Sequence, residues 1–113
     1  MKRNTAQLKE QLIQTGIDEI GKHGIEQLSL RTVAKACGVT HGTPYRHFES
    51  KEGYLKVVLT QLSLFLNLEI NENIDATGSA RDQLTQLGLN FIIFAKTYPY
   101  FFEALFIKFP FKY

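Results

Sequence analysis

The sequence has a single cysteine, three prolines and no long run of apolar residues. One cysteine, Cys37, excludes a disulfide within the chain and fits a reducing compartment. No segment approaches the roughly 18 to 20 apolar residues that are needed to cross a bilayer. The N-terminal stretch MKRNTAQLKEQ also lacks the apolar region of a secretory signal. We therefore expect a cytoplasmic protein without membrane-spanning segments.

The charge of the chain is small but unevenly distributed. The 113 residues suit one compact domain, or one domain and part of another, and their net charge is only +2. Residues 1–51 carry eight bases against five acids, a net charge of +3, and hold all three histidines. The remaining residues carry five bases and six acids. A basic bias confined to the first half is what contacts with phosphate groups require.

A short helix capped by Ser29, a glycine-containing turn and a second short helix are predicted within residues 29–51. The apolar residues of the first helix recur at helical spacing: Leu30, Val33, Ala34 and Cys37. Gly38 follows them, at the place where helices often end in a left-handed conformation. The second helix is expected near residues 41–48. This arrangement is the helix-turn-helix pattern, whose second helix enters the major groove of DNA.

The start of that second helix is ambiguous, because Pro44 lies near its first turn. If Thr40 is the N-cap, Pro44 takes the fourth helical position, where its ring and missing N–H disturb the turn. If Thr43 is the N-cap, Pro44 takes the favoured first position. Both registers remain open. In either, the helix offers hydrogen-bond donors and amphipathic rings: His41, Thr43, Tyr45, Arg46 and His47.

A first helix is predicted over about residues 6–23, with Asn4 or Thr5 as its N-cap. Gly16 in its interior costs about 1 kcal/mol relative to alanine, so close approach of another helix is a plausible reason for it. Gly24 is expected to end the helix in a left-handed cap.

The second half is predicted to be helical as well. Ser50 is expected to cap a helix that runs to about residue 72, and a loop follows. Ser79 then starts a fifth helix, with Asp82 completing a capping box. Apolar residues line one broad face of it: Leu84, Leu87, Gly88, Phe91, Ile92, Phe94 and Ala95. Tyr98-Pro99 breaks this helix, and residues 100–106 begin a sixth.

Residues that could support catalysis or metal binding are few: Cys37, His23, His41 and His47. The turn between Cys37 and His41 removes them from a common helical face, and no carboxylate stands at ligand spacing. A buried cysteine usually acts as a small apolar residue. Gly-rich phosphate loops and His-Asp-Ser arrangements are absent. We predict a protein that is not an enzyme and has no catalytic residues, metal site or cofactor.

Residues 29–55, SLRTVAKACGVTHGTPYRHFESKEGYL, resemble the helix-turn-helix signature of the TetR family of transcriptional regulators. The similarity extends over about residues 7–67. The residues that carry it are Gly24, Ala34, Gly38-Val39-Thr40, Gly42-Thr43, Tyr45, Phe48, Ser50-Lys51-Glu52 and Leu55. Pro44 stands where members often carry leucine. The later segment NFIIFAKTYPYFFEALF is similar to the apolar helix, proline and aromatic helix start of the family's ligand domain.

The resemblance implies an all-α fold in two parts. Residues 7–67 correspond to a three-helix DNA-binding domain, with the helix-turn-helix at about 29–48. A long connecting helix follows, and residues 68–113 correspond to part of a helical ligand-binding and dimerisation domain.

The resemblance further implies a homodimer that binds double-stranded DNA at a partly palindromic operator and represses transcription. A small-molecule inducer in the C-terminal domain would release the DNA. The residues matched to DNA contacts are Arg31, Thr32, Thr40, His41, Gly42, Thr43, Tyr45, Arg46, His47 and Lys51. Those matched to ligand contacts are Phe91, Phe94, Tyr98 and Phe102.

Alternative readings remain. Family members are usually longer, so this sequence is a fragment, a truncated product or a divergent short form. It could also be an interaction protein, which pairs with a full-length regulator and has no operator affinity of its own. Finally, Tyr45, His47 and Phe48 could pack the small core rather than face DNA.

Overall fold

A computed structural model of the chain describes residues 4–108, and all regular structure within that range is helical. The elements in order are α1 (Thr5–His23), η1 (Ile25–Gln27), α2 (Leu30–Ala36), α3 (Thr43–Phe48), α4 (Lys51–Ile70), α5 (Ala80–Thr97), α6 (Pro99–Glu103) and η2 (Ala104–Lys108). The all-α fold predicted from the sequence is confirmed for these residues. None of the described helices is long and apolar enough to span a membrane.

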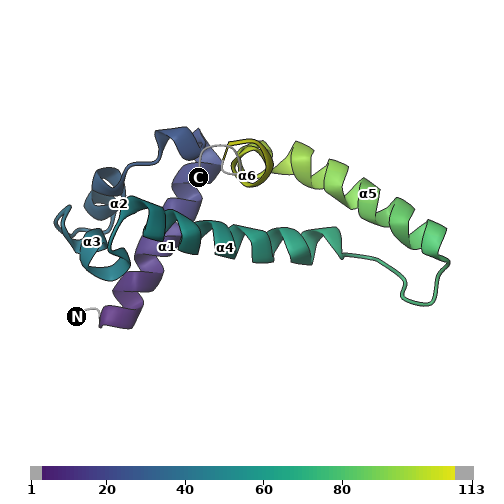
Figure 1. The fold of residues 1–113 in the computed structure, drawn as a ribbon, viewed down its shortest axis with the longest axis horizontal. Coiled ribbons are helices and arrows are strands. Elements are labelled where there is room, and N and C mark those ends of the chain that lie inside the picture. The colour runs from purple at the N-terminus through teal and green to yellow at the C-terminus, as the bar shows by residue number, and fades with distance from the viewer. Residues whose placement is uncertain (1–3, 109–113) are drawn as a thin grey trace.

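The molecule is elongated, with dimensions of 53 × 31 × 21 Å. Figure 1 shows α1, α2 and α3 gathered at one end, with α4 running from them towards the opposite end, which lies beyond its last turn. The connection 71–79 turns the chain there, α5 returns beside α4, and α6 lies against α1. The last described helices therefore come back to the first.

Four helices begin at a side chain that accepts a hydrogen bond from their first turn. Asn4 Oδ1 accepts from the Gln7 N–H at 2.8 Å, and the Gln7 side chain accepts from the Asn4 N–H, which completes a capping box. Ser29, Ser50 and Ser79 accept from the N–H three residues later, at 3.4, 3.0 and 3.1 Å. The three predicted serine caps are confirmed, and Asn4 rather than Thr5 caps α1. The capping box predicted for Ser79 and Asp82 is only half formed, because the Asp82 side chain does not accept from the Ser79 N–H.

Gly16 lets α4 pack closely against α1, as the sequence predicts. The Tyr54 ring from α4 fills the space beside Gly16, and a Cβ atom there would collide with its hydroxyl. That hydroxyl donates a hydrogen bond of 2.6 Å to the Leu12 carbonyl. Tyr54 is 0% exposed, and its burial, followed by the nearby Cys37, raises its pKa above the usual value. Tyr54 thus holds the two longest helices of the core together.

Two aromatic side chains of α6 pack against glycines at the end of α1. The Phe101 ring lies 3.1 Å from the Cβ position that Gly21 lacks. The Tyr100 ring lies 3.2 Å from the corresponding position of Gly24, whose φ of 88° also requires glycine. α1 ends after His23 as predicted, but the ψ of 158° at Gly24 lies outside the left-handed helical region expected for this cap. The same glycine that ends the helix makes room for α6.

Several helix ends differ from the sequence prediction. α4 ends at Ile70 rather than near residue 72. The break at Tyr98-Pro99 is confirmed, but α6 begins at Pro99, a favoured first helical residue, and ends at Glu103. The backbone then widens into the π-helical turn η2, so residues 100–106 are not one α-helix.

The apolar face of α5 is only partly covered. Phe94 is 2% exposed, whereas Ile92 is 56% exposed. A polar residue that the sequence did not single out is also buried: Asn90 is 7% exposed. Its Nδ2 donates to the carbonyl oxygens of Ile70 and Glu72, each at 2.8 Å. Asn90 therefore satisfies carbonyl groups at the C-terminal end of α4, which have no partner within that helix.

The domain boundary near residue 67 stays a prediction. Residues 67 and 68 lie inside α4, which contacts both α1 and α5. One helix thus belongs to both proposed parts. Residues 109–113, which the prediction assigned to the second part, lie outside the described residues.

Candidate nucleic-acid interface

The turn between α2 and α3 depends on one glycine. α2 ends with Cys37 buried, and Gly38 follows with a φ of 72°. The Val39 N–H donates to the Ala34 carbonyl at 3.0 Å, and the Gly38 N–H donates to the Lys35 carbonyl at 3.1 Å. These bonds satisfy the last carbonyls of α2 and fix the turn that leads to α3. The left-handed glycine predicted from the sequence is present.

α3 begins in neither of the two predicted registers. Its N-cap is Gly42, which makes no side-chain hydrogen bond, so Thr43 and Pro44 are the first two helical residues. The missing N–H of Pro44 costs nothing there, because the first N–H groups of a helix have no helical partner. The Pro44 ring is buried in the core. His41 and Gly42 lie in the turn before α3 rather than in the helix.

Most of the ten residues predicted to contact DNA lie on the surface at this end of the molecule. Eight are exposed: Arg31, Thr32, Thr40, His41, Gly42, Tyr45, Arg46 and Lys51. His47 is half-buried, with its ring 6.1 Å from that of Phe48. Thr43 is the exception, because only 5% of it is exposed. The surface can present a set of donors to a partner, but Thr43 contributes little area to it.

Phe48 belongs to the core and not to this surface. It is 6% exposed and packs edge-on against Tyr54, with ring centroids 5.1 Å apart. Tyr45, one turn earlier on α3, is 48% exposed. The alternative that Tyr45, His47 and Phe48 mainly pack the core is therefore correct for Phe48 and wrong for Tyr45, while His47 is only half-buried.

Basic and polar groups from three helices meet around one shallow cavity of about 290 Å³. Its lining includes Arg31 from α2, His41 from the turn, Tyr45 from α3 and Lys51 from α4. These residues are up to 20 positions apart in the sequence, and the fold brings them together. Two permanent cations and a phenol hydroxyl around one hollow suit an oxyanion such as a DNA phosphate. Ser29, which the sequence marked only as a cap, also lines this cavity.

A series of hydrogen bonds links the turn before α3 to α3 itself. Arg46 Nη2 donates to Thr43 Oγ1 at 2.9 Å, and Thr43 Oγ1 lies 3.1 Å from Thr40 Oγ1. The three residues thus form a connected polar row from the turn into α3. The sequence marked all three as contacts to DNA but did not reveal that they contact one another.

One cation near α3 was missed by the sequence reasoning. Lys9 Nζ lies 5.7 Å from the centroid of the Phe48 ring, so α1 places a basic side chain beside α3. Lys9 comes long before the helix-turn-helix in the chain, and only the packing of α1 reveals its position. No local pattern in the sequence could have identified it.

The four residues predicted to bind a ligand fall into two groups. The rings of Phe94 and Tyr98 are 5.3 Å apart, and both line a cavity of about 200 Å³ between α4 and α5. Phe91 and Phe102 instead lie against Phe106, at 6.0 and 4.9 Å. The structure brings together two of the four at a cavity and places the others elsewhere.

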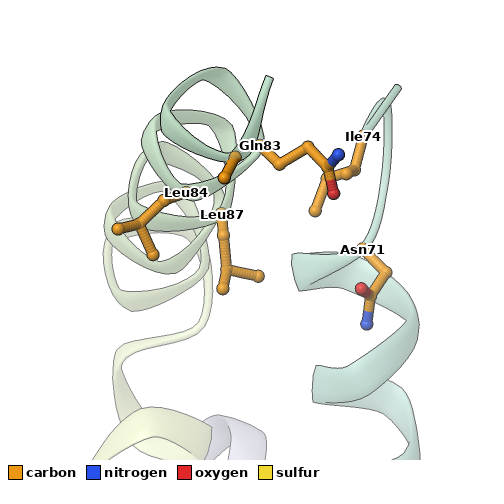
Figure 2. Close-up of a pocket in the computed structure, with 6 residues that line it drawn as sticks. Asn71, Ile74, Gln83, Leu84 and Leu87 are labelled. Carbon is orange, nitrogen blue, oxygen red and sulfur yellow. The ribbon is translucent and has the colours of Figure 1, made fainter. Parts of the chain in front are cut away.

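A larger hollow, about 400 Å³, lies where α4 and α5 join (Figure 2). Its lining comes from the end of α4, the connection and the start of α5, and includes Asn71, Ile74, Gln83 and Leu87. Gln83 extends towards the connection and donates to the Gly78 carbonyl at 2.9 Å. None of the predicted ligand residues lines it.

No group of histidine, cysteine, aspartate and glutamate side chains suited to a metal ion occurs within residues 4–108. Cys37 is buried, and its Sγ lies 3.3 Å from Thr15 Oγ1 on α1. This thiol therefore faces the core rather than His41, which lines the surface cavity.

Residues 12–58, which include α2, the turn and α3, match the family described as bacterial regulatory proteins, tetR family. This part of the chain carries the sequence pattern of the TetR family. The chain is 30% identical over 92 residues to the "Probable acrEF/envCD operon repressor" of Escherichia coli (strain K12), an alignment that covers 81% of this chain and 41% of the relative. It is 27% identical over 82 residues to the "HTH-type transcriptional repressor KstR2" of Mycolicibacterium smegmatis, covering 73% and 40%.

A crystal structure of a TetR-family transcriptional regulator from Haemophilus influenzae has the same fold, with a TM-score of 0.61 and 24% identity. That match covers 87% of this chain and 54% of the other. The chain spans 41% of the length of the Escherichia coli relative. The family is one of regulatory proteins and not of enzymes, in agreement with the sequence prediction.

Proposed function

We propose that this chain binds double-stranded DNA through α2, α3 and the start of α4, and that it regulates transcription as a repressor. The observation on which the proposal rests is the convergence of Arg31, His41, Tyr45 and Lys51 around one cavity, with Arg46 exposed on the same helix as Tyr45. The match of residues 12–58 to the TetR family supports it.

The proposed contacts divide into two kinds. Tyr45 and Lys51 hold a phosphate, and the position of Lys51 in the first turn of α4 adds the favourable field of a helix N-terminus. Arg31 and Thr32, exposed at the start of α2, bind the neighbouring backbone. These contacts fix the orientation of α3 on the duplex without reading its sequence.

Base reading is assigned to α3 and the turn before it. Arg46 is exposed on α3 and reaches the O6 and N7 acceptors of guanine in the major groove. His41 and His47 stand on either side of it in the chain. No atom lies within 4 Å of the Cβ position that Gly42 lacks, which leaves room for a DNA backbone there. Thr40 is exposed and can donate its hydroxyl.

Replacing Arg46 and Lys51 with alanine, one at a time, distinguishes the contact to a base from the contact to a phosphate. Arg46→Ala should weaken binding to the preferred duplex by about 1–3 kcal/mol and relax the choice of base at one position. Lys51→Ala should weaken binding to every duplex. It should also lower, by about 1, the steepness with which the logarithm of the binding constant falls with the logarithm of salt concentration (the salt slope). The measurement is a titration of selected and scrambled duplexes at several salt concentrations. Equal losses from both variants on all duplexes would refute the assignment of base reading to Arg46.

Lys56→Ala is the matched control for these variants. Lys56 is also an exposed lysine of α4, but it does not line the cavity. Its removal changes the net charge by the same amount as the removal of Lys51. A salt slope that falls equally for both lysines would show that only the overall charge matters.

A homodimer on a partly palindromic operator, released by a small-molecule inducer, is the finer form of the proposal. The cavity between Phe94 and Tyr98 is the site we assign to the inducer, with Phe91 and Phe102 outside its lining. Its volume, about 200 Å³, suits only a small ligand. We place the protein in the cytoplasm, where its DNA target would be.

A second candidate is an interaction protein that pairs with a full-length regulator and does not bind an operator itself. The exposed apolar residues of α5 favour it, since Leu84, Ile92 and Ile93 are 69%, 56% and 58% exposed. Selection from random duplexes, together with the mass in solution, separates the candidates. A dimer on an enriched palindrome supports the repressor, whereas association without duplex enrichment supports the second candidate.

A further inference from the structure

Thr43 occupies an unusual place for a residue in a DNA-facing segment. It is the first residue of α3, yet it is only 5% exposed, whereas Thr40 before it and Arg46 after it are both exposed. Its hydroxyl is shared with the two flanking side chains, at 3.1 Å to Thr40 Oγ1 and 2.9 Å to Arg46 Nη2. Little of the Thr43 side chain is left for a direct contact with a duplex.

The donors and acceptors in these hydrogen bonds follow from the chemistry of the Arg46 guanidinium and the two threonine hydroxyls. A guanidinium group only donates, so Thr43 Oγ1 must accept from Arg46. The single hydroxyl hydrogen of Thr43 can then point to Thr40 Oγ1. In that arrangement the hydroxyl hydrogen of Thr40, which is exposed, is available to an acceptor outside the protein. The series therefore runs from Arg46 through Thr43 to Thr40.

We propose that Thr43 is a positioning residue that holds the Arg46 guanidinium in place for reading a base, an inference that rests on the proposed function. A free arginine side chain samples many rotamers, and ordering them opposes binding. The bond to Thr43 orders the side chain before DNA arrives. It uses one Nη2 hydrogen and leaves Nη1 and Nε free to donate.

The positioning follows from helix geometry as well as from the hydrogen bond. Thr43 and Arg46 are three residues apart in α3, so their side chains lie on the same face. The backbone of Thr43 is fixed in turn, because its N–H bonds the Thr40 carbonyl at 3.0 Å and Pro44 is buried beside it. A buried anchor thus holds an exposed side chain that would otherwise move freely.

The test compares two substitutions of Thr43. Thr43→Val keeps the shape and removes the hydroxyl, while Thr43→Ser keeps the hydroxyl. On duplexes that differ only at the guanine read by Arg46, Thr43→Val should reduce the preference for guanine about five- to tenfold. Thr43→Ser should restore most of that preference. Binding to scrambled duplexes should be the same for both variants and the wild type.

Repeating the comparison in an Arg46→Ala background isolates the effect of the pair. Thr43→Val should there cause no further loss of base preference, because the side chain it positions is gone. An equal loss in both backgrounds would overturn the proposal, as would a uniform loss on every duplex, which would indicate a direct phosphate contact. Thermal unfolding of each variant checks that α3 remains folded.

A second measurement on the free protein separates this inference from the proposed function. Nitrogen-15 relaxation of the Arg46 Nε–H group reports its order, and Arg81 serves as the reference. Arg81 is exposed on α5, and its side chain has no hydrogen bond among the contacts within residues 4–108. Arg46 should be more ordered than Arg81 in the wild type and equally mobile in Thr43→Val. Equal mobility in the wild type would overturn the positioning role, whereas a failure of the wild type to select any duplex would count against the proposed function alone.

Discussion

Replacing Gly16 with alanine is expected to lower the free energy of unfolding by about 2–4 kcal/mol. The added methyl group would collide with the Tyr54 hydroxyl, which is buried and donates to the Leu12 carbonyl. Relief requires the ring to move, which breaks that bond and disturbs the packing of α4 on α1. The gain in helix propensity, about 1 kcal/mol, offsets only part of this cost. Denaturant unfolding followed by circular dichroism measures the change.

Gly88→Ala is the matched control for Gly16→Ala. Gly88 lies inside α5, and no atom is within 4 Å of its missing Cβ position. The same substitution there should raise the free energy of unfolding by roughly 0.5–1 kcal/mol through helix propensity alone. If both alanine variants were stabilised equally, the close packing of Tyr54 against Gly16 would not restrict the folded state.

Replacing Phe94 with alanine is expected to destabilise the protein by about 3 kcal/mol, at the low end for a buried phenylalanine because a cavity lies beside it. Phe94 is 2% exposed, and its ring lies 6.0 Å from Phe65 on α4 and 5.3 Å from Tyr98. Its loss should loosen α5 from α4. Hydrogen exchange should therefore accelerate in α5 and α6 more than in α2 and α3, a pattern that mass spectrometry of peptides can detect.

The neighbouring substitution Ile93→Ala is the control. Ile93 is 58% exposed on the same helix, so its truncation should change the free energy of unfolding by no more than about 0.5 kcal/mol. A large effect at Ile93 would mean that this side chain is covered in solution, for example by another copy of the chain. Measuring both variants at two protein concentrations separates that case.

The sequence predicted the features that depend on a few consecutive residues. The serine caps and the left-handed Gly38 follow from the backbone preferences of single residues, and they are present as expected. The close approach at Gly16 was also predicted, because a glycine inside a helix needs a reason. That the approaching group is Tyr54 could not be read from the sequence, since the two residues are far apart in the chain.

The start of α3 and the burial of Thr43 were not predictable in the same way. Two residues could have capped the helix, and the observed N-cap, Gly42, leaves no side-chain signal. The Thr43 hydroxyl contacts the side chains of Thr40 and Arg46, and residue identities alone do not specify these contacts. The DNA-contact residues as a set remain a prediction, and the proposed experiments address them.

The apolar face of α5 shows another limit of periodicity. The spacing of its apolar residues identified only part of the covered side, because Leu84, Gly88 and Ile92 of the predicted face are exposed. Phe94 and Asn90 are buried, whereas Leu84 is exposed. Asn90 was overlooked because an asparagine in an apolar row resembles an interruption, although its amide in fact bonds the end of α4.

The contact between Gly21 on α1 and Phe101 on α6 has a consequence for the order in which the chain can fold during synthesis. The two residues are separated by about 80 positions in the sequence. At roughly 5–20 residues per second, a ribosome needs about 4–16 s to make the intervening chain. Throughout that interval the end of α1 lacks its aromatic partner. Until α6 has been synthesised, the surface around Gly21 is therefore uncovered, and chaperones or another nascent chain can bind there.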